Sequence, residues 1–205
     1  MNYDTLASKE SIEKTIDALK ERGHLPELVE SRAEALKRIK ELIPQDASVM
    51  NGASRTLEEI GFVDYLKEGT HGWNNVHDAI LSEKDPAKQA ALRKQSVLSD
   101  YYLGSAHAIA ETGEMLIASN SGSQLPHIVF TSPNLILVVG AQKITPTLTD
   151  AFDRLEKHVI PLEDERMQKA MGMGTYPSKI LVVKREQPFM GRKSHVIFVN
   201  ESLGF

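Results

Sequence analysis

Two charged side chains follow apolar runs and are candidates for chemistry. Glu111 comes directly after Ala108-Ile109-Ala110, where partial desolvation would make its carboxylate a base or nucleophile. Lys143 lies just beyond the apolar run 135–139, and its ammonium could pair with an anionic ligand. Two simpler interpretations remain open: Glu111 faces water in a hairpin turn, and Lys143 is a solvated loop lysine.

Small and polar residues cluster in four loops near these charges, at 51–54, 111–113, 120–124 and 140–143. Backbone N–H groups of a glycine-containing loop before a helix can cradle a phosphate or carboxylate, but ordinary capped turns and surface loops have the same composition. His127 lies close to these loops, although a lone histidine is more often structural than a ligand. The candidate ligand-binding residues are Asn51, Gly52, Ala53, Ser54, Thr112, Gly113, Asn120, Gly122, Ser123, His127 and Gly140.

Apolar spacing predicts the elements that would position these loops. Helical spacing is present over 8–23, 31–43, 56 onward, 87–104, 146–159 and 163–171, and short strands are expected at 48–50, 106–110, 114–119, 128–131, 135–139, 180–183 and 195–199. The run 135–139 has no polar face, so it should lie centrally with cover on both sides. We therefore expect a layered α/β fold with a mostly parallel or mixed sheet and flanking helices, formed by one domain over 1–205 on which the N-terminal helices within 1–46 pack.

Composition excludes several kinds of site. The chain has 205 residues, a net charge of −4 and no cysteine, so disulfides, thiolate metal sites and a cysteine nucleophile are excluded. The seven histidines have no metal-site spacing, and we predict no metal and no cofactor. The charge gives no general reason to bind nucleic acid or a membrane surface. No apolar run approaches membrane-spanning length and the first residues do not resemble a signal peptide, so we expect a cytoplasmic protein.

Three segments of the sequence resemble the LUD-domain family, the LutC/YkgG type of proteins associated with lactate utilisation. They are Gly52-Ala53-Ser54-Arg55-Thr56-Leu57-Glu58-Glu59-Ile60-Gly61, Ala108-Ile109-Ala110-Glu111-Thr112-Gly113 and Leu125-Pro126-His127-Ile128. The resemblance implies a fold similar to the NagB/RpiA/CoA-transferase-like group. It also implies a role beside iron–sulfur partner subunits in oxidising L-lactate to pyruvate, or in related organic-acid metabolism.

The leading hypothesis is a small anionic molecule held at the carboxyl ends of strands, with Glu111 as base or nucleophile and Lys143 as charge partner. Two alternatives stay open: a transferase or isomerase acting on a CoA ester or sugar phosphate, and a ligand-sensing module without turnover. The sequence does not decide whether the protein is an enzyme. Related folds often assemble, which makes a homo-oligomer compatible with this hypothesis.

Overall fold

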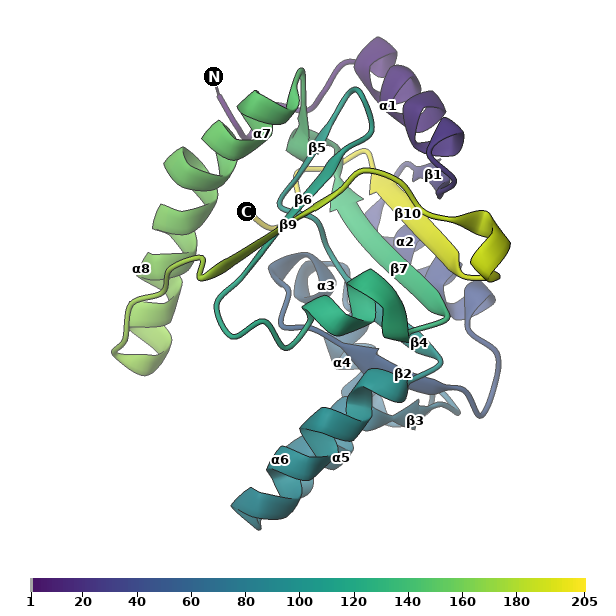
Figure 1. Ribbon diagram of the computed structural model, residues 1–205, viewed down its shortest axis with the longest axis vertical. Helices are drawn as coiled ribbons and strands as arrows, with labels where there is room; N and C mark the ends of the chain where they lie inside the picture. Colours follow the sequence, from purple (N-terminus) through teal and green to yellow (C-terminus); the bar gives the residue numbers. More distant parts are fainter. Residues whose placement is uncertain (1) are drawn as a thin grey trace.

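The computed structural model describes residues 2–205 and contains two sheets flanked by helices (Figure 1). The helices are α1 (Lys9–Glu21), α2 (Arg32–Leu42), α3 (Arg55–Glu59), α4 (Phe62–Glu68), α5 (Val76–Ser82), α6 (Pro86–Gln95), α7 (Leu148–Arg154) and α8 (Ile160–Met171). The strands are β1 (Leu25–Val29), β2 (Ser48–Asn51), β3 (Asn74–Asn75), β4 (Tyr101–Gly104), β5 (Ala108–Ala110), β6 (Met115–Ser119), β7 (Asn134–Gly140), β8 (Ile144–Thr145), β9 (Lys179–Val183) and β10 (Lys193–Val199). The short helical turns are η1 (Ser96–Leu98), η2 (His127–Thr131), η3 (Ala141–Lys143), η4 (Leu155–Val159) and η5 (Pro188–Met190).

The larger sheet has six strands in the order β1-β10-β7-β4-β2-β3, and each neighbouring pair is parallel. The smaller sheet has the order β8-β5-β6-β9. In it β5 pairs with β8 in parallel, whereas β6 is antiparallel to both β5 and β9. The expectation of a layered α/β fold with mostly parallel and some antiparallel pairing is confirmed.

Alternation along β7 explains the layering. Ile136 and Val138 pack with α2, α3 and α4 in one core, whereas Leu137 and Val139 pack with α1 and the smaller sheet in another. Both faces of the strand are therefore buried, as its continuous apolar run predicts. The outer face of the smaller sheet is covered by α7 and the turn η4, and Figure 1 shows α7 and α8 along that side of the molecule.

Two predicted elements are wrong. The run 128–131, expected to be a strand, belongs to the single-turn π-helix η2, because a run of four residues cannot distinguish a strand from a helix by periodicity. The helix expected to continue through 87–104 ends at Gln95, and β4 forms at 101–104 instead. Tyr101 and Tyr102 favour a strand, because aromatic side chains are enriched in strands, and β4 pairs with β2 on one side and β7 on the other.

No helix of the described residues is long and apolar enough to cross a lipid bilayer.

Candidate functional site

A cavity of about 270 Å³ lies where β2, β4, β6 and β7 end. Its wall includes the loop after β2, the turn after β4, the loop after β6 and the lysine after β7. Helix α8 and residues 175–177 form another side. Parallel strands in open α/β sheets present their carboxyl ends to ligands in this way. The volume is near the lower limit for pockets that hold drug-sized ligands, so the site suits a small molecule.

Lys143 lies at the buried wall of this cavity, with an exposed fraction of 3%. Its Nζ donates to Thr56 Oγ1 at 3.0 Å and to Ser105 Oγ at 3.3 Å. Both partners are neutral hydroxyls, and Lys143 forms no ion pair with any carboxylate in residues 2–205. The ammonium therefore lacks the countercharge that a buried cation ordinarily requires.

Burial lowers the pKa of the Lys143 amine to about 7. The positive charge of Arg154 lowers this pKa further, and the carboxylate of Glu59 opposes the shift. The carboxylate of Glu59 accepts hydrogen bonds from Arg55 and from the backbone N–H of Gly204, so its negative charge is not available to Lys143 alone. Near neutral pH the Lys143 amine is consequently close to the midpoint of its titration, which suits an amine that binds anions or reacts as a base or nucleophile.

Arg154 is a second buried cation behind the site, with no exposed surface. Its Nη1 donates to the carbonyl oxygen of His107 at 2.7 Å. Within residues 2–205 its Nε and Nη2 atoms have no hydrogen-bond partner. A guanidinium stays charged in proteins, so Arg154 contributes a positive field to this region.

His107 supplies a neutral hydrogen-bonding group to the cavity wall. Burial, followed by the charges of Lys143 and Arg154, lowers its pKa to about 3. Nδ1 of the ring accepts the backbone N–H of Ala118 at 3.1 Å, so the single proton of the neutral ring is on Nε2. His107 is therefore a donor through Nε2.

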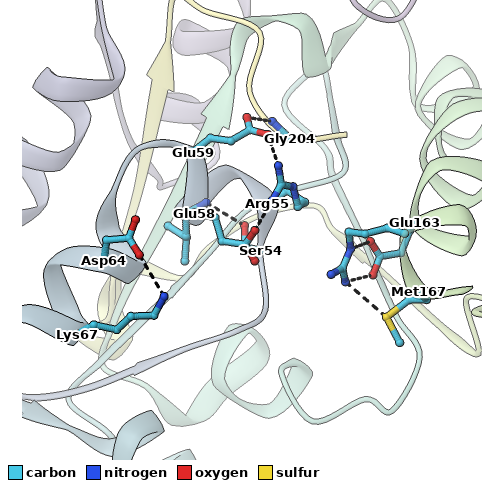
Figure 2. A network of polar contacts seen from close by, with 11 residues as sticks. Ser54, Arg55, Glu58, Glu59, Asp64, Lys67, Glu163, Met167 and Gly204 are labelled. Atoms are coloured by element: carbon cyan, nitrogen blue, oxygen red, sulfur yellow. Dashed lines mark hydrogen bonds and ion pairs between the residues drawn. The ribbon is translucent and has the colours of Figure 1, made fainter. Parts of the chain in front are cut away.

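Ion pairs line the outer part of the cavity. Arg55 donates to Glu58 at 2.5 Å, and on α8 Arg166 forms two hydrogen bonds with Glu163, at 2.6 and 2.7 Å. Glu58 also raises the pKa of Arg166, although less than Glu163 does, so the two pairs are electrostatically coupled. Figure 2 shows Arg55 and Glu58 on one side and Glu163 on the facing helix. The mouth thus has alternating charges, whereas the interior has an unpaired ammonium.

The structure brings together part of the predicted site. Six of the predicted residues line the cavity: Gly52, Ala53, Ser54, Asn120, Ser123 and Lys143. Seven do not: Asn51, Glu111, Thr112, Gly113, Gly122, His127 and Gly140. The expectation that all four loops meet at one site is therefore met for three loops and not for the loop at 111–113.

Glu111 lies on a separate cavity of about 200 Å³ near α1. Its Oε1 accepts from Ser11 Oγ at 2.6 Å, and its Oε2 pairs with Lys14 Nζ at 2.8 Å. These hydrogen bonds from Lys14 and Ser11 lower its pKa, so the carboxylate is ionised and already satisfied. The structure does not place Glu111 as a base beside Lys143.

The turn that carries Glu111 has a structural role. Gly113 has φ +92°, a conformation that favours glycine, and Arg22 Nε donates to the carbonyl oxygen of Thr112 at 2.6 Å. This turn connects β5 to β6, which are antiparallel, so the ends of the two strands must lie at opposite edges of the smaller sheet. The loop after β6 reaches the Lys143 cavity, and the loop after β5 therefore cannot.

His127 and Gly140 are also structural. The His127 ring is buried, stacks on Tyr102 with ring centroids 4.4 Å apart, and hydrogen-bonds Ser132. A Cβ atom on Gly140 would lie 2.1 Å from Gln142 Oε1, so this glycine permits close packing behind the cavity.

Gly122 and Asn51 support the loops that carry the lining residues. Gly122 has φ +85° and its N–H donates to Ser119 Oγ, which fixes the loop after β6. Asn51 is buried, and its Nδ2 donates to the carbonyl oxygen of Gly52.

Sequence reasoning missed Thr56, Ser105 and His107. Ser105 follows β4, which was expected to be helical, so the rule that ligands gather at strand ends was not applied there. His107 lies close to the candidate loops in the sequence but was interpreted as a structural histidine, because a lone histidine is more often structural than a ligand. Thr56 was regarded only as a helix-opening residue. No group of three or more metal-ligating side chains occurs within residues 2–205.

Comparisons of the sequence and of the fold with known proteins identify the family of this chain. The LUD domain model matches residues 12–199. The chain also resembles the crystal structure of a DUF162 family protein from Deinococcus radiodurans, with a TM-score of 0.58, 12% sequence identity and coverage of 96% of this chain and 100% of that one. This likeness concerns the fold, and no curated protein matches the sequence. Because the family model spans most of the sequence, the chain belongs to the LUD-domain family.

Proposed function

We propose that the protein binds a small 2-hydroxy or 2-oxo acid, such as lactate or pyruvate, in the Lys143 cavity, and that it serves L-lactate oxidation to pyruvate or related organic-acid metabolism. One observation supports this most directly. Lys143 is buried at the cavity wall, yet within residues 2–205 its ammonium hydrogen-bonds only the hydroxyls of Thr56 and Ser105. A bound carboxylate would supply the missing countercharge.

The other groups on the wall fit the rest of such a ligand. The hydroxyl of Ser105 and the Nε2–H of His107 are neutral hydrogen-bonding groups that suit the C2 oxygen of a hydroxy or oxo acid. Asn120 and Ser123 add polar groups to the lining of the cavity. Few polar groups on a largely preformed wall are typical of small-ligand sites.

Oxidation of lactate to pyruvate releases two electrons and two protons, and an acceptor is part of the proposal. The chain has no cysteine thiolate to hold an iron–sulfur cluster. We therefore assign the electrons to iron–sulfur partner subunits, while this chain holds and orients the acid. The two protons pass to solvent, because Lys143 stays protonated as the countercharge of the bound carboxylate.

A thermal-shift panel tests the ligand class. Lactate, pyruvate, CoA, an acyl-CoA and ribose 5-phosphate are each added to the wild-type protein, to Lys143→Met and to Lys67→Met. Lys67 is an exposed lysine on α4 that pairs with Asp64, so it is a matched control away from the cavity. Lactate and pyruvate should raise the melting temperature of the wild type and of Lys67→Met, and not that of Lys143→Met.

The other outcomes are equally informative. Stabilisation by CoA compounds or sugar phosphate alone would overturn the organic-acid proposal in favour of a transferase or isomerase. Equal responses of wild type and Lys143→Met would show that the cavity lysine does not hold the ligand. Lactate binding without lactate-dependent dye reduction by the protein assembled with its iron–sulfur subunits would leave a sensing module.

A further inference from the structure

We propose that Lys143 forms a covalent imine, a Schiff base, with the C2 carbonyl of a 2-oxo acid held in this cavity. The inference rests on the proposed function and deepens it, because it distinguishes how the site treats an oxo acid from how it treats a hydroxy acid. The position of the buried amine at the cavity wall supports it.

The amine belongs to a residue of the cavity wall and pairs with no carboxylate among residues 2–205. Lys143 lines the cavity, and its two hydrogen-bond partners are the hydroxyls of Thr56 and Ser105. A carboxylate of the protein fixed beside the amine would keep it protonated in the empty site, whereas hydroxyls can also donate to a neutral amine. Backbone at Gly204 closes one side, since a Cβ there would lie 3.1 Å from Nζ.

The charges around the amine favour its neutral form. Burial and the nearby Arg154 lower the Lys143 pKa to about 7, and only Glu59 opposes them. Burial, together with the positive charges of Lys143 and Arg154, also keeps His107 neutral. Desolvation together with a neighbouring cation is the usual means by which proteins activate a lysine for Schiff-base formation.

The reaction balances without a redox partner. The neutral Nζ of Lys143 attacks C2 of the oxo acid and forms a carbinolamine. Both amine protons leave with the former carbonyl oxygen as water, and a C=N bond replaces the C=O bond. Thr56, Ser105 and His107 line the same cavity as Lys143, and we assign their hydroxyls and the Nε2–H of His107 as the donors to the departing oxygen. Lactate has no carbonyl at C2 and would bind only non-covalently.

Borohydride trapping tests the imine directly. The wild-type protein is mixed with pyruvate and sodium cyanoborohydride near pH 8, digested with trypsin and analysed by mass spectrometry. The expected product is an adduct on Lys143 whose added mass equals pyruvic acid minus one oxygen atom, with tryptic cleavage blocked at that lysine. At pH 8 the neutral fraction of an amine of pKa about 7 is roughly 300 times that of an ordinary lysine, so Lys143 should be labelled far ahead of Lys67.

The controls separate covalent from non-covalent binding. Lactate in place of pyruvate should give no adduct, and Lys143→Arg, which keeps the charge and loses the amine, should give none on the peptide carrying position 143. Lys67→Met should label at Lys143 as the wild type does. Labelling of Lys143 should increase as the pH rises through about 7.

Failure of the imine and failure of the proposed function give different results. If pyruvate raises the melting temperature of the wild type but Lys143 is not trapped, the imine is refuted and the organic-acid site stands. Equal labelling of Lys143 and Lys67 would also refute the imine, because it would reflect unselective chemistry. If neither lactate nor pyruvate stabilises the protein and no adduct forms, both proposals fall.

Discussion

Replacing Lys143 by methionine should stabilise the folded protein, and the gain should depend on pH. Methionine nearly matches the shape of lysine and removes a charge that is 3% exposed and has no ion-pair partner among residues 2–205. The hydroxyls of Thr56 and Ser105 keep each other as hydrogen-bond partners at 3.3 Å. The variant therefore loses little and is freed of a desolvated cation.

The size of the effect follows from the pKa of Lys143, which burial lowers from 10.5 to about 7. Each unit corresponds to about 1.4 kcal/mol, so the charged amine destabilises the fold by about 5 kcal/mol below pH 7. Between about pH 7 and 10.5 the unfolded chain keeps a proton that the folded chain has released, so wild-type stability rises with pH there. The advantage of Lys143→Met should accordingly shrink by about 2 kcal/mol between pH 7 and pH 9.

Urea unfolding of the wild type, Lys143→Met and Lys67→Met at several pH values from about 6 to about 9 measures this dependence. The difference between wild type and Lys143→Met should be largest at the acid end and decrease steadily above pH 7. Lys67→Met should follow the wild type throughout, because Lys67 is exposed. A difference for Lys143→Met that stays constant over the whole range would refute the assignment of a perturbed amine.

Three further predictions follow from the same contacts. Lactate affinity, measured by calorimetry, should fall about tenfold per pH unit above pH 7, because the anion needs the protonated Lys143; an affinity independent of pH would contradict this. Glu111→Gln should leave lactate affinity unchanged, because Glu111 lies outside the Lys143 cavity, and a loss of affinity would show that Glu111 belongs to the binding site. The lowered pKa of Glu111 stabilises the wild-type fold above pH 4.5, so the unfolding free energies of the wild type and Glu111→Gln, measured in urea, should converge as the pH falls below that value. Gly113→Ala should lower the free energy of unfolding in urea by about 1–2 kcal/mol, because φ at this position is +92° and the backbone of Ala18 would lie 3.2 Å from the new Cβ atom. Lactate affinity should stay constant, and a loss of affinity would show that the turn contributes to binding.

Local sequence patterns were sufficient to predict much of the fold. The helices predicted over 8–23 and 31–43 begin at Ser8 and Ser31, residues of a type that favours helix N-caps, and in the structure their hydroxyls accept from the backbone N–H three positions later. The apolar run 135–139 lies in β7 with cover on both faces. These features depend on neighbouring residues alone. Where two structures fit the same local pattern, as for 128–131, tertiary packing decided the outcome and the prediction was wrong.

The candidate site was predicted only in part. Local sequence shows where a strand ends, but the direction of one strand relative to another depends on how the strands pair. Lys143 follows a parallel strand and reaches the cavity, but Glu111 follows β5 and lies at the other edge. A hairpin at 111–113 already requires β5 and β6 to run in opposite directions, so that signal was present in the sequence. The contributions of Arg154 and Ser105 arise from contacts across 47 and 38 positions, which no local pattern contains.

A crystal structure of the protein with lactate tests the central claim most directly, because the claim is that Lys143 holds an organic anion. We predict electron density for the acid in the cavity where β2, β4, β6 and β7 end, with its carboxylate within hydrogen-bonding distance of Lys143 Nζ and of the hydroxyl of Thr56 or Ser105. Density for lactate at another place, with the Lys143 cavity holding only water at a saturating concentration of ligand, would contradict the account.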